Sequence, residues 1–438
     1  MVIIGILLIV LFGYGLANLL ILKGELFEKI CLGYILGIGI FTFVWFLLNL
    51  VKIPYTLLSG SVLLIILNII VFILNRLKFG RYFGNVNLSF KYFMKLNTLE
   101  KVILGIIGFL CLSALIQNLY WPVMYWDSLV LYDFRAKLFA DTGFMMAAIT
   151  RGYFFGYPLL TSLSHTWVYL LSGINPSFLY GLFYLGFVFV MFFNFKKLNL
   201  NRSFVLLLTL IVAISPRLFD HTQWAYTNLP YTIYLVLGSI YLYFGVRKKD
   251  LGIFVISALL VGLSTWTRSA EPFWLSCVVM AVVSSLFIKK WLWPLVYTTT
   301  VGLLMLPWRL FQSAYNEGSA NVANQVVSTT SSVVQNLQMA IIKPTFNFFV
   351  TNVINMYLVY FILLGIVVLI KLFTKSKEWF FTVLIFFDLA LAFAGTLIFV
   401  RYTPYWQDIP DSLARMVMFI PPMIIFLTSE LLYEVKTR

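Results

Sequence analysis

The chain has 438 residues, of which 62% are apolar and only 11% are charged. Apolar runs recur from one end to the other, and a helix of about 20 such residues crosses the ~30 Å hydrocarbon core of a bilayer. This composition excludes a soluble globular protein. It predicts an all-α polytopic membrane protein in which residues 1–438 form a single integral membrane domain.

Thirteen segments are apolar enough to be predicted spans. They are 2–22, 31–50, 55–75, 102–119, 177–195, 203–219, 229–246, 251–267, 272–288, 293–308, 351–371, 379–400 and 415–432. The first has neither the basic leader nor the cleavage site of a signal peptide, so we expect it to be a retained helix. The interval 157–172 is ambiguous because it is short for a span and carries His165 near its middle.

The formal net charge of +15 helps to decide whether 157–172 crosses. If it does not cross, the connections place 21 Lys and Arg on one face and 10 on the other, giving net charges of about +14 and about +2. An excess of basic residues is typical of the cytoplasmic face. We therefore predict a plasma-membrane protein with its N-terminus outside, its C-terminus inside, and 157–172 as a helix lying at the outer surface.

The predicted outer face holds two long segments, 120–176 and 309–350, and three short ones, 216–228, 268–272 and 401–415. The first long segment is rich in Trp and Tyr, and its residues 126–139 have the pattern of a helix lying on the membrane. The second long segment is polar and is a candidate lid.

Arginine is concentrated on the predicted outer face, where it makes up seven of the ten basic residues, against five of 21 inside. The planar guanidinium group matches phosphate oxygens with paired donors. The set therefore favours recognition of a lipid-linked phosphate or pyrophosphate. The alternative for each arginine is that it anchors a helix end or pairs with an outer acid.

Asp127 is the candidate general base, because it follows the 102–119 span within Tyr-Trp-Asp-Ser-Leu. Its alternative role is to begin a helix.

Asp133 either takes part in chemistry or pairs with Arg135 or Lys137. Arg268 and Glu271 either pair structurally or line the roof of a cavity.

Other features add constraints. His165 and His221 lie on the outer side, where isolated histidines are more often structural than ligands, and no metal-binding spacing is present. Asp388 falls within a span and is expected to face other helices. No P-loop, dinucleotide fingerprint or nucleophile elbow occurs, so we expect no cytoplasmic domain driven by nucleotide hydrolysis.

Several of these residues carry a resemblance to a known superfamily. Trp126-Asp127-Ser128, the run 135–139 and Tyr157-Pro-Leu-Leu resemble the GT-C superfamily of multi-spanning glycosyltransferases, and within it the protein-mannosyltransferase and aminoarabinose-transferase type. Thr-Arg-Ser-Ala-Glu at 267–271 and Asp-Ser-Leu-Ala-Arg at 411–415 match later outer turns. The resemblance covers about residues 120–425 and rests on the order of these motifs.

The resemblance implies a GT-C-like bundle of about 13 transmembrane helices with outer juxtamembrane helices. It also implies transfer of a sugar from a polyprenyl-phosphate donor to a glycan, lipid or protein acceptor. Asp127 would take the acceptor proton, and outer arginines would stabilise the departing phosphate. Many members carry a second acid after the aspartate, where this chain has Ser128, so we expect no metal and no other cofactor. The residues assigned on this basis are Arg268, Arg217, Arg401 and Arg415 for the donor phosphate, and Asp133, Arg151, Tyr157, His165, His221 and Glu271 for substrate.

Two other functions stay open. A flippase or other transporter of lipid-linked saccharides would need charged or broken helices near mid-membrane, and only Asp388 qualifies. A polymerase or ligase of lipid-linked glycans would favour a late main loop such as 309–350, but it leaves Trp126-Asp127 and Tyr-Pro-Leu-Leu unexplained.

Overall fold

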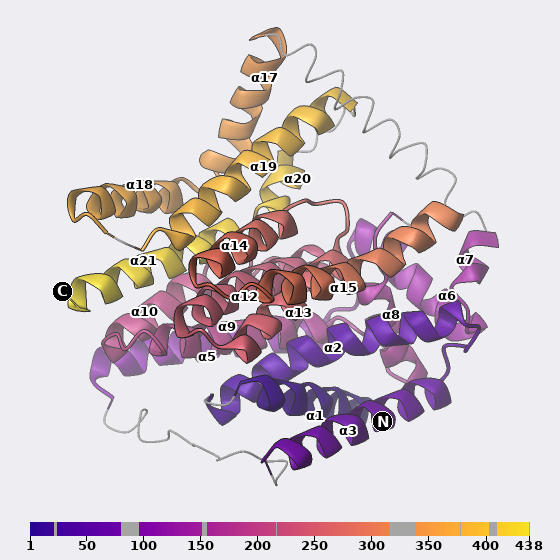
Figure 1. Ribbon diagram of the computed structural model, residues 1–438. Coiled ribbons are helices and arrows are strands. Elements are labelled where there is room, and N and C mark those ends of the chain that lie inside the picture. Colours follow the sequence, from indigo (N-terminus) through magenta and orange to yellow (C-terminus); the bar gives the residue numbers. More distant parts are fainter. Residues whose placement is uncertain are drawn as a thin grey trace.

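The computed structural model describes residues 1–21, 24–79, 96–150, 156–215, 217–315, 339–376, 378–402 and 410–437. Over these residues every regular element is a helix, and no strand occurs. The prediction of an all-α protein is confirmed for this part of the chain (Figure 1).

Within the described ranges, seven helices are long and apolar enough to cross a membrane. They are α1 (Val2–Leu20), α2 (Leu26–Leu50), α3 (Leu57–Phe79), α5 (Thr98–Tyr120), α9 (Phe178–Lys196), α12 (Asn228–Lys248) and α19 (Phe380–Tyr402). Their length and apolar character make the chain a multi-pass membrane protein.

The other predicted spans correspond to helices that are shorter, less apolar or broken. They are α10 (Arg202–Ala213), α13 (Leu251–Thr267), α14 (Trp274–Phe287), α15 (Trp293–Tyr315), α18 (Leu358–Phe373) and α21 (Ile420–Thr437). The span expected at 351–371 coincides with a break, because the helical stretches Ile342–Ile354 and Leu358–Phe373 meet at 94°. That first stretch comprises the end of α17 (Met339–Phe349) and the π-helix η2 (Val350–Ile354). The total of thirteen spans therefore stays a prediction.

The predicted outer segments contain short helices. They are the π-helix η1 (Ser128–Asp133), α6 (Phe134–Thr142), α7 (Met146–Thr150), α8 (Leu160–Leu170), α11 (His221–Trp224) and α20 (Pro410–Met416). At 1.5 Å per residue, α8 is about 16 Å long and too short to cross a bilayer. Its residues 160–168 are all buried, so protein encloses it instead of leaving one face open.

The second predicted outer segment, 309–350, is described only at its ends. Residues 309–315 continue α15, and residues 339–349 form α17. The polar stretch 316–338, which prompted the expectation of a lid, lies outside the described residues.

Glycines allow the backbones of neighbouring helices to come close together. On α1, a Cβ placed at Gly13 would lie 1.9 Å from the carbonyl oxygen of Gly33 on α2, and on α12 a Cβ at Gly245 would lie 2.9 Å from Phe254 on α13. Helices in membranes associate through such close backbone packing, because lipid supplies no hydrophobic driving force between them. The α12 helix is almost completely enclosed.

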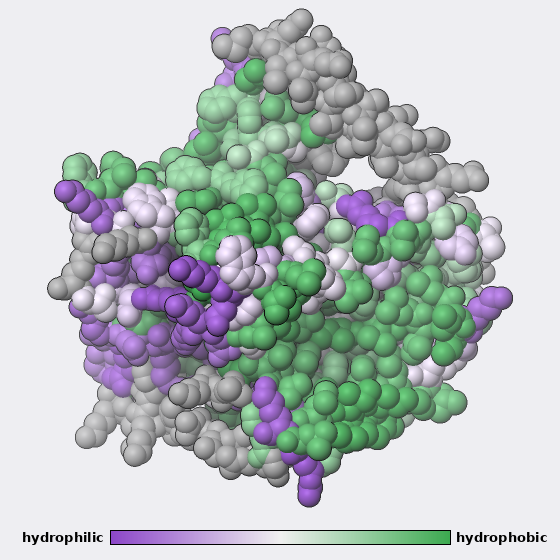
Figure 2. All heavy atoms as spheres, in the orientation of Figure 1, coloured by the Kyte–Doolittle hydropathy of each residue, from purple (hydrophilic) through white to green (hydrophobic). Residues whose placement is uncertain are grey.

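Charged connections gather at one end of the bundle. Lys196 pairs with Glu25, Lys197 pairs with Glu28, and Arg202 lies 2.6 Å from Glu100. In Figure 2 hydrophilic residues collect at the left, near α5 and α10, whereas apolar residues cover α1, α3 and α15. The segments η1, α6 and α7 come after the opposite end of α5, away from these charged connections. This arrangement agrees with the predicted separation of the outer and inner connections. Which of these ends faces outward stays a prediction.

Candidate functional site

Four segments that are far apart in the sequence meet at the candidate site: 125–128, 217–228, 268–271 and α20. The second of these contains two residues with left-handed backbone, Arg217 with φ +65° and Ala225 with φ +52°, on either side of α11. Left-handed backbone costs about 1 kcal/mol or more for a non-glycine residue, so surrounding contacts must stabilise it. Such strain is frequent at functional sites.

Two aspartates and two arginines form a continuous chain of charges. Nη1 of Arg415 lies 3.8 Å from Oδ2 of Asp127, and Nε of Arg415 lies 3.3 Å from Oδ2 of Asp411. Nη2 of Arg217 lies 2.6 Å from Oδ1 of Asp411. Asp127 is the accessible member, with 41% of its side chain exposed against 15% for Arg415. Asp411 thus holds both guanidinium groups in place while Asp127 stays open to solvent.

Aromatic rings form a wall beside these arginines. The guanidinium carbons of Arg217 and Arg415 each lie 5.9 Å from the centre of the Trp224 ring, and that of Arg415 lies 5.4 Å from the Tyr226 ring. Tyr125 packs against Trp224 at 5.3 Å. Cations are attracted to aromatic faces at these distances. The wall therefore keeps two positive charges close together beside a single shared carboxylate.

His221 packs against the Trp224 ring of this wall and bonds the backbone of Arg217. Its Nδ1 donates to the carbonyl oxygen of Arg217 at 2.7 Å, and its ring lies 4.4 Å from that of Trp224. Burial lowers the pKa of His221 to about 3, and the nearby charges of Arg415 and Arg217 act in the same direction. The imidazole is therefore neutral at physiological pH. Its Nε2 has no hydrogen-bond partner among the described residues.

Arg268 and Glu271 form a buried pair next to this cluster. Arg268 donates to Glu271 from Nε at 2.6 Å and from Nη2 at 2.5 Å, and its Nη1 donates to Thr227 at 3.1 Å and to Asn228 at 3.2 Å. The Tyr157 ring covers its guanidinium group at 4.9 Å. These contacts match the structural pairing that the sequence left open. Arg268 connects the turn before α14 to the start of α12, and Asn228 also donates to the carbonyl oxygen of Arg415.

Asp133 and His165 belong to a separate buried cluster. His165 Nδ1 lies 3.1 Å from Asp133, Tyr169 donates to the same carboxylate at 2.5 Å, and Lys137 lies 2.9 Å from it. Burial alone raises the pKa of Asp133, but the hydrogen bond and charge of His165, with the donors of Tyr169 and Lys137, lower it to about 2. His165 Nε2 reaches the Tyr180 hydroxyl at 3.1 Å. The cluster ties η1 and α6 to α8 and α9.

The remaining predicted outer arginines contact backbone or fall outside the described side chains. Arg135 donates to the carbonyl oxygen of Tyr157 at 3.1 Å, and Arg309 donates to that of Ser269. Arg151 lies outside the described residues, and the side chain of Arg401 is not among those described.

The structure therefore brings together Asp127, Arg217 and Arg415 from the predicted set, with His221 behind them and the Arg268–Glu271 pair beside them. It separates Asp133 and His165 from this group. Trp224 and Tyr226 were not singled out in the sequence, although the 216–228 segment contains an aromatic cluster that signals such a wall.

Among the described residues, no group of three or more His, Cys, Asp and Glu side chains is arranged to hold a metal ion. No protein-family model, no curated protein and no solved structure matches the chain.

Proposed function

We propose that the protein is a membrane glycosyltransferase that moves a sugar from a polyprenyl-phosphate donor to an acceptor hydroxyl on a glycan, lipid or protein. The observation that supports this most is the position of Asp127, an accessible carboxylate beside the paired guanidinium groups of Arg415 and Arg217. A base next to two guanidinium groups that share the Asp411 carboxylate suits a reaction that removes a proton and releases a phosphate.

In the proposed reaction, Asp127 takes the proton of the acceptor hydroxyl. The acceptor oxygen then forms a bond to the anomeric carbon, and the bond between that carbon and the phosphate oxygen breaks. The leaving phosphate keeps the electron pair, and Arg415 and Arg217 stabilise its charge. Arg268 remains a candidate phosphate ligand. Its bonds to Glu271, Thr227 and Asn228 suit it better to a structural role, in which it holds the 268–271 turn against the start of α12.

The proposal includes the membrane arrangement inferred from the loop charges. The chain would cross the plasma membrane about thirteen times, with the Asp127 site on the extracytoplasmic side. The separation of Lys196, Lys197 and Arg202 from the Asp127 cluster supports this, because the predicted inner connections contact one another.

Sugar transfer by purified protein in lipid, with a panel of polyprenyl-phosphate sugars, tests the proposal. Asp127→Asn is expected to lose turnover while retaining donor binding, because the change removes the base and preserves the side-chain shape. Asp141→Asn is the matched control, since Asp141 is an exposed acid of the same outer segment. If Asp127→Asn transfers as fast as the unchanged protein, Asp127 is not the base.

A transporter of lipid-linked saccharides is the second candidate. The 94° break between η2 and α18 supplies the kind of interrupted helix that many transporters use. In that case, no panel donor would be turned over by the unchanged protein, and labelled lipid-linked saccharide would cross the bilayer of the same vesicles.

A further inference from the structure

Asp388 lies within the apolar helix α19 and is completely buried. Neither of its carboxyl oxygens has a hydrogen-bond partner, and it forms no salt bridge, among the residues that the structure describes. An ionised carboxylate in such a place costs several kcal/mol at least. The carboxyl group must therefore be neutralised by a proton or by a bound cation.

The neighbouring hydroxyl group favours a proton. Ser276 lies beside Asp388, and its Oγ already donates to the carbonyl oxygen of Phe273 at 2.7 Å. A hydroxyl group has a single proton to donate, so only its lone pairs remain for Asp388. Because the Ser276 proton is directed at Phe273, it does not stabilise an ionised Asp388.

The helices packed against α19 supply no compensating charge among the described residues. The titratable groups within electrostatic reach of Asp388 are Cys277 on α14 and Tyr231 on α12. On α17, Lys343 is exposed, and on α21, Glu430 lies 3.5 Å from Lys371. Asp388 thus has no cationic partner in this part of the chain.

Two more buried polar atoms nearby lack partners among the described residues. They are the hydroxyl oxygen of Tyr231 on α12 and Oε2 of Glu271, whose other oxygen accepts both bonds from Arg268. Tyr231 lies within electrostatic reach of both Glu271 and Asp388. Buried polar atoms are almost always paired, and ordered water commonly provides the missing partner.

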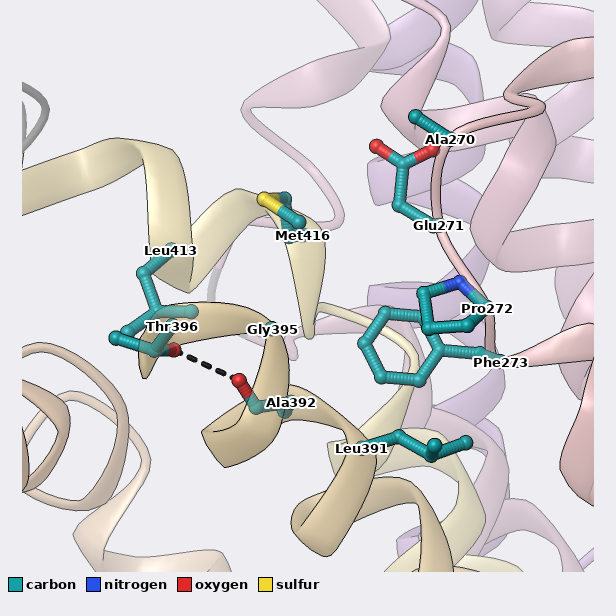
Figure 3. A pocket seen from close by; sticks show the side chains of 10 residues that line it. All are labelled: Ala270, Glu271, Pro272, Phe273, Leu391, Ala392, Gly395, Thr396, Leu413 and Met416. Carbon is teal, nitrogen blue, oxygen red and sulfur yellow. Dashed lines mark hydrogen bonds between the residues drawn. The ribbon is translucent and has the colours of Figure 1, made fainter. Parts of the chain in front are cut away.

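A small cavity adjoins Glu271 and α19. It is lined by Glu271, Phe273, Leu391, Ala392, Gly395 and residues of α20, and Figure 3 shows the Glu271 carboxyl group on one side and α19 on the other. Leu391 and Ala392 lie one helical turn from Asp388. The cavity volume is about 30 Å³, which admits water but not a sugar ring.

We propose that Asp388 is a proton-binding site within the membrane, in which its buried carboxyl group, unpartnered among the described residues, holds a proton that water from the neighbouring cavity can exchange. The site does not depend on the proposed glycosyl transfer.

Infrared absorption of the full chain in an ester-free maltoside detergent tests the site directly. At pH 7 and with no sodium present, the protein is expected to show a protonated-carboxyl C=O band. This band should shift when aspartate carries a ¹³C side-chain carboxyl, should shift again in D₂O, and should be missing in Asp388→Asn. If Asp388→Asn fails to fold, the isotope label in the unchanged protein still distinguishes an aspartate band from bands of Glu430 and Glu271. Absence of any aspartate-sensitive band at pH 7 would overturn the proposal.

One further measurement separates the proton from a cation. Adding sodium chloride in place of N-methylglucamine chloride is expected to leave the band unchanged, and its loss would show that a cation binds there instead.

Discussion

Oδ2 of Asp127 and Nη1 of Arg415 lie 3.8 Å apart, although the first residue precedes η1 and the second lies in the last turn of α20. Asp411 holds the Arg415 side chain from the other side, and Asn228 donates to the Arg415 carbonyl oxygen. The arginine is therefore fixed in place beside an accessible acid, as a phosphate ligand next to a base must be.

Arg415→Ala is expected to weaken binding of a polyprenyl-phosphate sugar by about tenfold to a hundredfold, because a charge-assisted hydrogen bond to phosphate contributes about 1.5–3 kcal/mol. Direct titration of the donor into purified protein measures the change. Lys52→Ala removes an exposed positive charge from the same predicted face and serves as the control. Equal donor affinity in the two variants would count against Arg415 as a phosphate ligand.

The stability of the fold is expected to fall as the pH drops below about 6.5, because His221 is held neutral with a pKa of about 3 while the unfolded chain binds a proton near 6.5. The loss from this group is about 2 kcal/mol at pH 5 and is complete near the folded pKa. His221→Asn retains a donor for the Arg217 carbonyl and removes the titration. The melting temperature of this variant should therefore depend less on pH between 6.5 and 4; an unchanged dependence would show that other groups cause it.

Asp133→Asn is expected to lower the free energy of unfolding by about 2–4 kcal/mol, because His165, Tyr169 and Lys137 all direct donors at a buried carboxylate. The folded pKa of Asp133 is about 2, below its usual value near 4. Its stabilisation is therefore present at neutral pH and is lost as the pH falls from about 4 towards 2. Thermal unfolding of Asp133→Asn and of Tyr169→Phe, which removes a single hydrogen bond, provides the comparison. If Asp133→Asn costs no more than Tyr169→Phe, the acid is not the centre of the cluster.

Arg268→Gln is expected to destabilise the fold by about 3–5 kcal/mol, because it leaves the buried Glu271 carboxylate uncompensated. The double variant Arg268→Gln/Glu271→Gln should be more stable than Arg268→Gln alone. A double-mutant cycle from unfolding measurements gives the coupling between the two residues. Additive effects would show that the pair is not coupled.

Gly13→Ala is expected to lower the melting temperature strongly, since the added Cβ would lie 1.9 Å from the carbonyl oxygen of Gly33 and force α1 and α2 apart. Gly302→Ala is the matched control, because nothing lies within 4 Å of a Cβ there. That change should be neutral or stabilising by up to about 1 kcal/mol, since alanine favours helix. Equal melting temperatures for the two variants would contradict the close packing of α1 on α2.

The helical class and the membrane character follow from local patterns, which is why both could be predicted. Each apolar run of about 20 residues by itself predicts a span. Within a bilayer such a run forms a helix, because a helix satisfies all backbone hydrogen bonds within the segment. The break between η2 and α18 was not visible in this way. The run 351–371 is mostly apolar, although Asn352 and Asn355 lie close to the break. The directions of η2 and α18 are set by packing against α20 and α21, respectively.

The residue chemistry of the site was likewise partly visible in the sequence. Arginine enrichment on one predicted face and an acid among aromatics singled out Asp127, Arg217 and Arg415 before any contact was known. The sequence alone did not decide whether Arg268 binds phosphate or pairs structurally with Glu271. Its bonds to Glu271, Thr227 and Asn228 depend on where α12 begins relative to the turn before α14.

By itself, the sequence determined that this is an all-helical membrane protein and which charged residues are candidates for chemistry, because hydropathy and charge are properties of each segment. Only the tertiary structure decided which candidates meet. It placed Asp127 with Arg415, assigned Asp133 and His165 to a buried cluster, and left Asp388 without a partner among the described residues. The physical reason is that such contacts join helices far apart in the chain, and their register depends on close packing at residues such as Gly13 and Gly245.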